Sequence, residues 1–153
     1  MPKLQDGASG APGWAHWLYE TLWRDADRVA TPEVSPQRVA LIGDAPALSE
    51  ALSARGDTVK AVASLAERAA NETFDLVVVV AHDQPGDDAG LALAHLLLHT
   101  AQEAVAANPN PRLAVILPPG AAESPRGAAA IGVVRVLGTE HPELSPIAVD
   151  LSA

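Results

Sequence analysis

Residues 76–80 of this chain read Leu-Val-Val-Val-Val, five apolar residues in a row of which four are β-branched. Such side chains favour strands, and a strand with no polar alternation is expected where helices cover both faces of a parallel sheet. Four further short apolar runs rich in β-branched residues occur in the chain, at 39–42, 58–62, 113–117 and 146–151. The sequence therefore predicts a sheet of about five parallel strands, with 76–80 as one of them.

Segments of helical character separate these runs, at 46–54, 64–71, 88–107 and 126–139. Pro46 stands where a helix can start and Gly56 stands just past its end, which is the usual placement of these two residues. Strands that alternate with helices predict an α/β fold. We therefore expect a doubly wound parallel α/β domain with about five strands and four helices.

The length of 153 residues allows one domain with a hydrophobic core. Residues 1–13 are polar and rich in Gly and Pro, which predicts a flexible arm. Residues 14–153 are expected to form a single unit, with a linker at 24–37 and an α/β core at 38–152. Four of the five aromatic residues stand together between Trp14 and Trp23.

The charge balance excludes several functions. Lys and Arg number 10 and Asp and Glu number 19, which gives a net charge of −9 and argues against binding to nucleic acid or to an anionic membrane. The longest apolar stretch, 91–98, is interrupted by His95 and is far shorter than the ~20 residues of a membrane span. No apolar segment of signal-peptide type follows the first Met, so we expect a cytoplasmic protein. Cysteine is absent, which excludes disulfides, thiolate zinc sites and a Cys nucleophile.

The first strand-to-helix turn lacks the glycines that bring backbone N–H groups to a dinucleotide pyrophosphate. Gly43 fits the pattern, but Ala45 and Leu48 occupy the other two glycine positions. A short-chain reductase also needs a Lys four residues after its Tyr, whereas Trp23 follows Tyr19 at that spacing. We expect no catalytic residue and no cofactor on this chain.

Two polar clusters could serve as sites. His95, His99 and Glu103 are spaced four apart, so they share one face of the long predicted helix. No third zinc ligand accompanies the two imidazoles, and we interpret the trio as a polar stripe with a His99–Glu103 pair and predict no metal site. Asp83, Asp87 and Asp88 are expected at the carboxyl edge of the sheet, where oxygen ligands could hold a cation, although a solvated loop that caps a helix is the commoner use of such a cluster.

The C-terminal third carries an ordered set of motifs: Pro-Arg-Gly-Ala-Ala-Ala-Ile-Gly at 125–132, Arg-Val-Leu from Arg135, Glu-His-Pro-Glu at 140–143 and Val-Asp-Leu at 149–151. Together with Leu18-Tyr19 and Trp23, this set resembles the noncatalytic structural subdomain of the ketoreductase region in modular polyketide synthases. The resemblance covers about residues 17–152. It departs from the family pattern at three places, where Ile131 replaces a Trp, Val133-Val134 replaces Leu-Gly and Pro118-Pro119 replaces Thr-Arg.

The resemblance implies a truncated Rossmann fold that braces a neighbouring catalytic ketoreductase subdomain, and NADPH is expected on that neighbour. It favours a strand over an amphipathic helix for residues 18–23, and it makes Leu18, Tyr19 and Trp23 candidates for the subdomain interface. The aromatic residues could equally cover the domain's own sheet.

The family motif Arg135, Glu140, His141 and Pro142 is expected to orient the last helix, since a basic residue near a helix end complements the dipole and His-Pro stops the turn. The alternative function is an independent small-molecule-binding α/β protein that uses the acidic loop 83–88.

Overall fold

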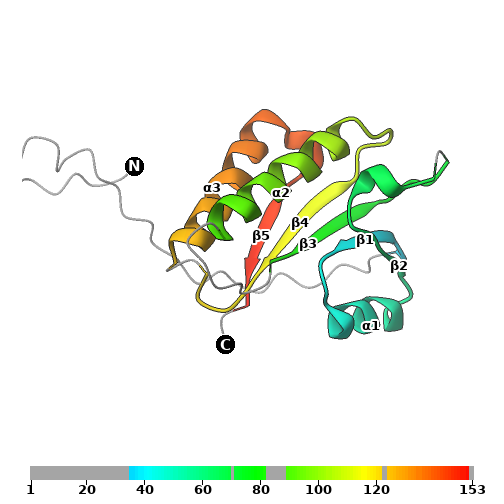
Figure 1. Cartoon of the computed structure of the whole chain (residues 1–153). Coiled ribbons are helices and arrows are strands. Elements are labelled where there is room, and N and C mark those ends of the chain that lie inside the picture. The colour runs from blue at the N-terminus through cyan, green and yellow to red at the C-terminus, as the bar shows by residue number, and fades with distance from the viewer. Residues whose placement is uncertain (1–34, 70, 82–88, 122–123, 152–153) are drawn as a thin grey trace, which may run out of the picture. The chain divides into compact units, whose positions relative to one another are not determined.

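A computed structural model describes residues 35–69, 71–81, 89–121 and 124–151 of the chain. Its centre is a sheet of five strands, all parallel, in the order β2-β1-β3-β4-β5 (Figure 1). The strands are β1 (Arg38–Ile42), β2 (Thr58–Ala61), β3 (Leu76–Val80), β4 (Arg112–Leu117) and β5 (Ile147–Asp150). The predicted parallel sheet is confirmed, and the wholly apolar run 76–80 is its middle strand.

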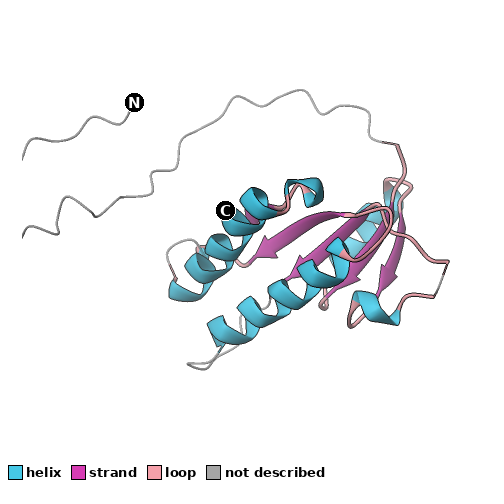
Figure 2. Ribbon diagram, turned by 90° about the horizontal axis from the view of Figure 1, so that it is seen from above, coloured by secondary structure: helices cyan, strands magenta, loops and turns pink. Residues whose placement is uncertain are grey.

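In the described residues, three α-helices lie between the strands: α1 (Pro46–Ala54), α2 (Ala89–Val105) and α3 (Pro125–Glu140). α2 and α3 lie side by side on one face of the sheet (Figure 2). The larger part of the core lies beneath them, built from alternate strand residues such as Val77, Val79 and Val115. α1 packs against the other face, where Leu48 and Leu52 contact a smaller cluster around Val39, Leu41 and Val78.

The prediction of a fourth helix over 64–71 is wrong. The structure has only a short 3₁₀ helix there, η2 (Leu65–Glu67). Arg68 takes an extended conformation that ends the helix after one turn, and Ala69 N–H donates to the Glu72 carboxylate (3.1 Å) where a helix would direct it to a carbonyl of the preceding turn. Leu65 N–H, which any helix start leaves without an intrahelical acceptor, donates to Glu103 of α2 (2.9 Å). A segment of eight residues gains too little from its own hydrogen bonds to compete with these contacts.

α3 starts at a capped end that brings it very close to the preceding loop. The Ser124 hydroxyl accepts a hydrogen bond from Gly127 N–H (3.0 Å), and Pro125 occupies the first helical turn, where its missing N–H costs nothing. A Cβ built on Gly127 would lie 1.9 Å from the carbonyl oxygen of Ala121. Glycine is therefore required at this position by the packing of the chain itself.

The two faces of the sheet are covered to different extents. α2 and α3 cover one face over β3, β4 and β5, whereas α1 packs over β1 and β2 on the other. Among the described residues, no second helix packs beside α1 on that face, which is therefore open near β5. Ile147 and Leu151 are exposed there. No described helix is both long and apolar enough to cross a membrane. The predicted arm 1–13, the predicted strand 18–23 and most of the linker lie outside the described residues.

Candidate functional site

The turn after β1 is where a dinucleotide-binding domain would hold its pyrophosphate. Gly43 takes a positive φ of 106°, which lets the chain leave the strand sharply. α1 then begins without a side-chain cap, and Pro46 stands in its first turn. Leu48 packs onto the sheet beside Val39 and Leu41. The position at which the dinucleotide-binding pattern has its third glycine is therefore used for packing in this chain.

The strand order reverses between β1 and β3, and ligands of open α/β sheets bind in the crevice at such a point. The side of this crevice that follows β1 is the turn with Gly43 and Asp44. The other side begins at Ala81, and the acidic loop with Asp83, Asp87 and Asp88 lies outside the described residues. A cation site formed by these three carboxylates stays a hypothesis.

The polar stripe of His95, His99 and Glu103 on α2 contributes to the packing of the fold. His99 Nδ1 lies 3.3 Å from one oxygen of Glu103, and the other oxygen accepts the N–H of Leu65 in η2 (2.9 Å). The His99–Glu103 pair that the spacing indicated is present, and it connects α2 to the segment between β2 and β3. In the described ranges, no three His, Cys, Asp or Glu side chains come together as they would in a metal site.

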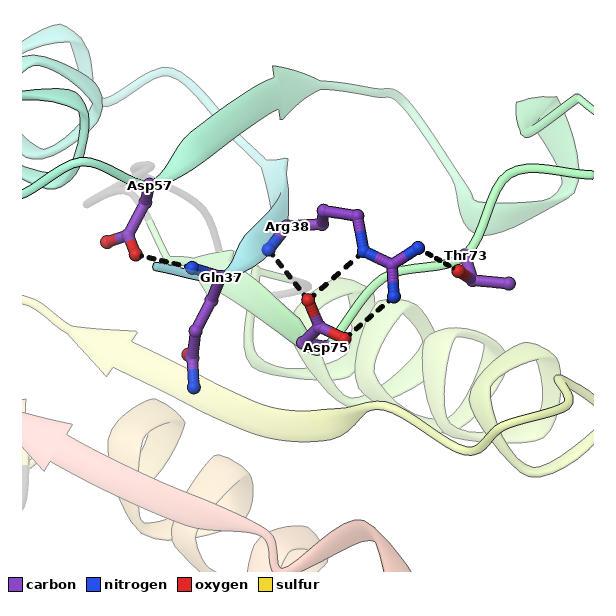
Figure 3. A network of polar contacts seen from close by, with 5 residues as sticks. All are labelled: Gln37, Arg38, Asp57, Thr73 and Asp75. Atoms are coloured by element: carbon purple, nitrogen blue, oxygen red, sulfur yellow. Dashed lines mark hydrogen bonds and ion pairs between the residues drawn. The ribbon is translucent and has the colours of Figure 1, made fainter. Parts of the chain in front are cut away.

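A polar network joins the amino ends of β1 and β3 (Figure 3). The carboxylate of Asp75 accepts hydrogen bonds from Arg38 N–H (2.8 Å), Nε (3.2 Å) and Nη2 (2.8 Å), and Arg38 also contacts Thr73. The guanidinium and the backbone N–H of Arg38 lower the pKa of Asp75. The network lies at the opposite edge from the carboxyl ends of the strands, where α/β folds bind ligands, and we assign it to holding the two strands in register.

A second carboxylate, Asp57, lies beside this network with its side chain fully buried. It accepts hydrogen bonds from Gln37 N–H (2.9 Å) and from Arg55 Nε (2.8 Å). Burial opposes the ionisation of Asp57, but the Gln37 N–H and the Arg55 guanidinium outweigh it, and the pKa of Asp57 is lowered. This contact connects the entry of β1 with the turn between α1 and β2.

The residues 135–142, which carry part of the resemblance noted in the sequence, form the end of α3 and the reversal into β5. α3 ends at Glu140, and the N–H of His141 donates to the carbonyl of Leu137 (2.7 Å). Pro142 then starts a second 3₁₀ helix, η4 (Pro142–Leu144), which places Leu144 fully inside the core. The helix α3 therefore ends at His141-Pro142, as the sequence predicted.

The assignment of Arg135 to the helix end is wrong. α3 continues to Glu140, and its last turn contains no basic residue. Arg135 is exposed one turn earlier, where a charge contributes little to the dipole because that effect is confined to the terminal turn. Of the four motif residues, His141 and Pro142 account for the geometry of the reversal.

A large apolar recess lies between α2 and α3 on their solvent side. It is a groove of about 610 Å³. Leu98, Ala101, Gln102 and Val105 of α2 line one wall at helical spacing, and the other wall is Gly132, Val133, Val136, Leu137, Glu140 and His141 at the end of α3. Leu98 is 45% exposed and Val136 is 53% exposed, although both are large apolar residues.

The sequence does not predict this groove directly, because the groove forms only when two helices separated by β4 pack together. One signal was available. Leu96, Leu97 and Leu98 are consecutive, so α2 is apolar on more than the one stripe that a half-buried helix needs. Leu97 is completely buried against the sheet, whereas its two neighbours face outward.

The candidate interface residues Leu18, Tyr19 and Trp23 lie outside the described residues. The groove and the end of α3 therefore form the site that the structure supports best. A scan of protein-family models and searches of curated proteins and solved structures found no match for this chain.

Proposed function

We propose that this chain is a noncatalytic, doubly wound and truncated Rossmann-like subdomain that braces the catalytic ketoreductase subdomain of a modular polyketide synthase. The ordered motifs of the C-terminal third support the proposal, together with a parallel α/β sheet in which those motifs fall on α3, the reversal and β5. In this proposal the neighbour binds NADPH and reduces a β-ketoacyl group carried on a phosphopantetheine arm. The protein is cytoplasmic and binds neither nucleic acid nor membrane.

The observation that carries the proposal is the apolar groove between α2 and α3. Contiguous apolar surface on a soluble domain marks an interaction site, since leaving it in water is unfavourable. Leu98 and Val136 face each other across the groove with about half of their surface accessible. A neighbouring subdomain that covers them would gain the burial of both side chains and of the wall between them.

The family motif supports the same surface. Glu140 and His141 line one end of the groove, and the reversal that His141 and Pro142 begin fixes where α3 stops. A motif that sets the end of this helix also sets the length of the groove. Bracing then means that two packed helices, held on a parallel sheet, offer a preformed surface to the catalytic subdomain.

The test is association of the full chain with a separately expressed ketoreductase catalytic subdomain encoded immediately downstream. We expect wild-type binding by calorimetry, and we expect Val136→Asp to weaken it at least tenfold, because a charge would be buried in an apolar contact. Thr139→Asp is the matched control, since Thr139 is exposed on the same helix and does not line the groove. It adds the same charge and should bind as the wild type does.

Absence of binding by the wild-type chain would sink the proposed function. Equal losses for Val136→Asp and Thr139→Asp would leave the bracing role standing but remove the groove from it. The melting temperature of each variant separates lost docking from lost folding.

A further inference from the structure

Gly132 stands in the middle of α3 at an exposed position. A Cβ built on it would meet no atom within 4 Å, whereas one on Gly127 would collide with the Ala121 carbonyl. Glycine inside a helix lowers the stability of that helix relative to alanine. The packing of this chain explains Gly127, but nothing in the described residues explains why Gly132 lacks a side chain.

The position of Gly132 within the groove supplies a reason. Gly132, Val136 and Glu140 follow one another at intervals of four, so they form one column along α3 that faces the groove. Leu98 and Ala101 of α2 stand in the opposite wall. The distance between packed helices depends on the side chains at their contact, and a glycine in one wall lets another backbone approach closely.

The chemistry of the walls points to a helix as the occupant. Both walls are helices whose backbone groups are hydrogen-bonded internally, so the groove offers no free strand edge for a β-strand to join. The lining is mostly apolar, with the carboxylate of Glu140 exposed at its end. A helix with an apolar stripe and one basic residue complements this surface, in the way that amphipathic helices fill hydrophobic grooves.

We propose that the α2–α3 groove receives an amphipathic helix of the catalytic subdomain, which crosses at Gly132 and presents a basic side chain to Glu140. This inference rests on the proposed function for the identity of the partner. It adds the secondary structure of the docking element, its charge and the residue over which it crosses.

The first experiment needs no partner. In the full chain alone, Gly132→Ala should raise the melting temperature by about 2–4 °C, because the added methyl group has room and alanine favours the helix. Gly138→Ala is the matched control on the same helix, since its Cβ would make only an ordinary contact of 3.7 Å with Pro146. A lower melting temperature for Gly132→Ala would show that the glycine serves this chain's own fold, and it would overturn the inference.

The second experiment measures binding of the downstream catalytic subdomain. We expect Gly132→Ala to weaken association about tenfold and Gly132→Leu to abolish it, although both variants stay folded, while Gly138→Ala binds as the wild type does. A substitution that stabilises the chain and weakens the complex is the signature of a glycine kept for a partner. Wild-type affinity for Gly132→Leu would overturn the inference and leave the proposed function standing.

A third arm separates the two proposals if the catalytic subdomain does not bind. The probe is a hydrocarbon-stapled helical peptide with leucine on three successive turns and one arginine. We expect it to shift the NMR signals of Leu98, Gly132 and Val136 at submillimolar concentration and to lose this effect on Gly132→Leu. Binding of the peptide without the catalytic subdomain would contradict the proposed function alone. The inference would be contradicted if the peptide did not bind, or if it bound the Gly132→Leu variant as tightly as the wild type.

Discussion

Gly127 is a residue at which the packing of this chain leaves no room for a side chain. A Cβ there would lie 1.9 Å from the carbonyl oxygen of Ala121 and 2.6 Å from the Ala121 side chain. The oxygen belongs to backbone, so it cannot move aside as a flexible side chain would. We expect Gly127→Ala to lower the free energy of unfolding by about 2–3 kcal/mol despite the better helix propensity of alanine.

Urea unfolding followed by circular dichroism measures this change. Gly138→Ala serves as the control on the same helix and should equal or exceed the wild type in stability, since its Cβ contact is an ordinary one. If Gly127→Ala were as stable as the wild type, the loop before α3 would move aside at little cost. The close approach of Gly127 to Ala121 would then contribute nothing to stability.

At the scale of elements, the junction between β1, α1 and β2 depends on one buried carboxylate. Asp57 joins Gln37, before β1, to Arg55, after α1, and its pKa is lower in the folded chain than in the unfolded one. The folded state therefore binds fewer protons, and stability is fully present above the unfolded pKa of about 3.9 and falls as the pH drops through the folded value.

The expected result is a free energy of unfolding that changes little between pH 7 and pH 5 and falls below about pH 4. Asp57→Asn should lower stability at pH 7 and make the decline below pH 4 shallower, because one of the groups with a lowered pKa is gone. Urea titrations at four pH values measure both effects. Glu50→Gln removes an exposed carboxylate of α1 and controls for the change in net charge. An unchanged slope for Asp57→Asn would show that Asp57 does not contribute to acid unfolding.

The elements that the sequence predicted well are those decided by local chemistry. The run 76–80 needs burial on both faces, and it is the middle strand of the sheet. α3 stops at His-Pro because proline cannot continue a helix. The helix expected at 64–71 ends after one turn, because Arg68 is extended and Ala69 N–H donates to the Glu72 carboxylate and not to a helical carbonyl.

The candidate site was harder to predict because it belongs to two helices at once. The consecutive leucines of α2 were the one local signal, and Val136 looks like an ordinary apolar position of α3. Only the packing of α2 beside α3 shows that Val136 and Leu98 face each other and remain exposed. Gly132 likewise has no special meaning in the sequence until the space around it is known.

At the scale of the whole molecule, one side of the described sheet carries both the apolar groove and the reversal at His141 and Pro142. The core beneath α2 and α3 is closed by residues of β1, β3, β4 and η4. It contains one aromatic residue, Phe74, whereas the other four aromatic residues of the chain stand between 14 and 23. Aromatic residues dominate interfaces as well as cores, so the crowding of four of them into ten positions of the sequence supports the proposed role in docking.

This argument predicts that Trp23→Ala weakens association with the catalytic subdomain at least tenfold, because truncating a buried Trp removes on the order of 200 Å² of contact surface. The melting temperature of the chain alone should change by less than about 2 °C, because a side chain that is buried only in the complex contributes little to the stability of the isolated chain. Calorimetric binding and thermal unfolding of the full chain measure the two effects. Trp14→Ala is the control, because Trp14 precedes the part of the chain that resembles the family, and it should leave binding unchanged. A large fall in melting temperature with unchanged binding would instead assign Trp23 to the internal packing of this domain, and the interface would then depend on the α2–α3 groove without the aromatic segment.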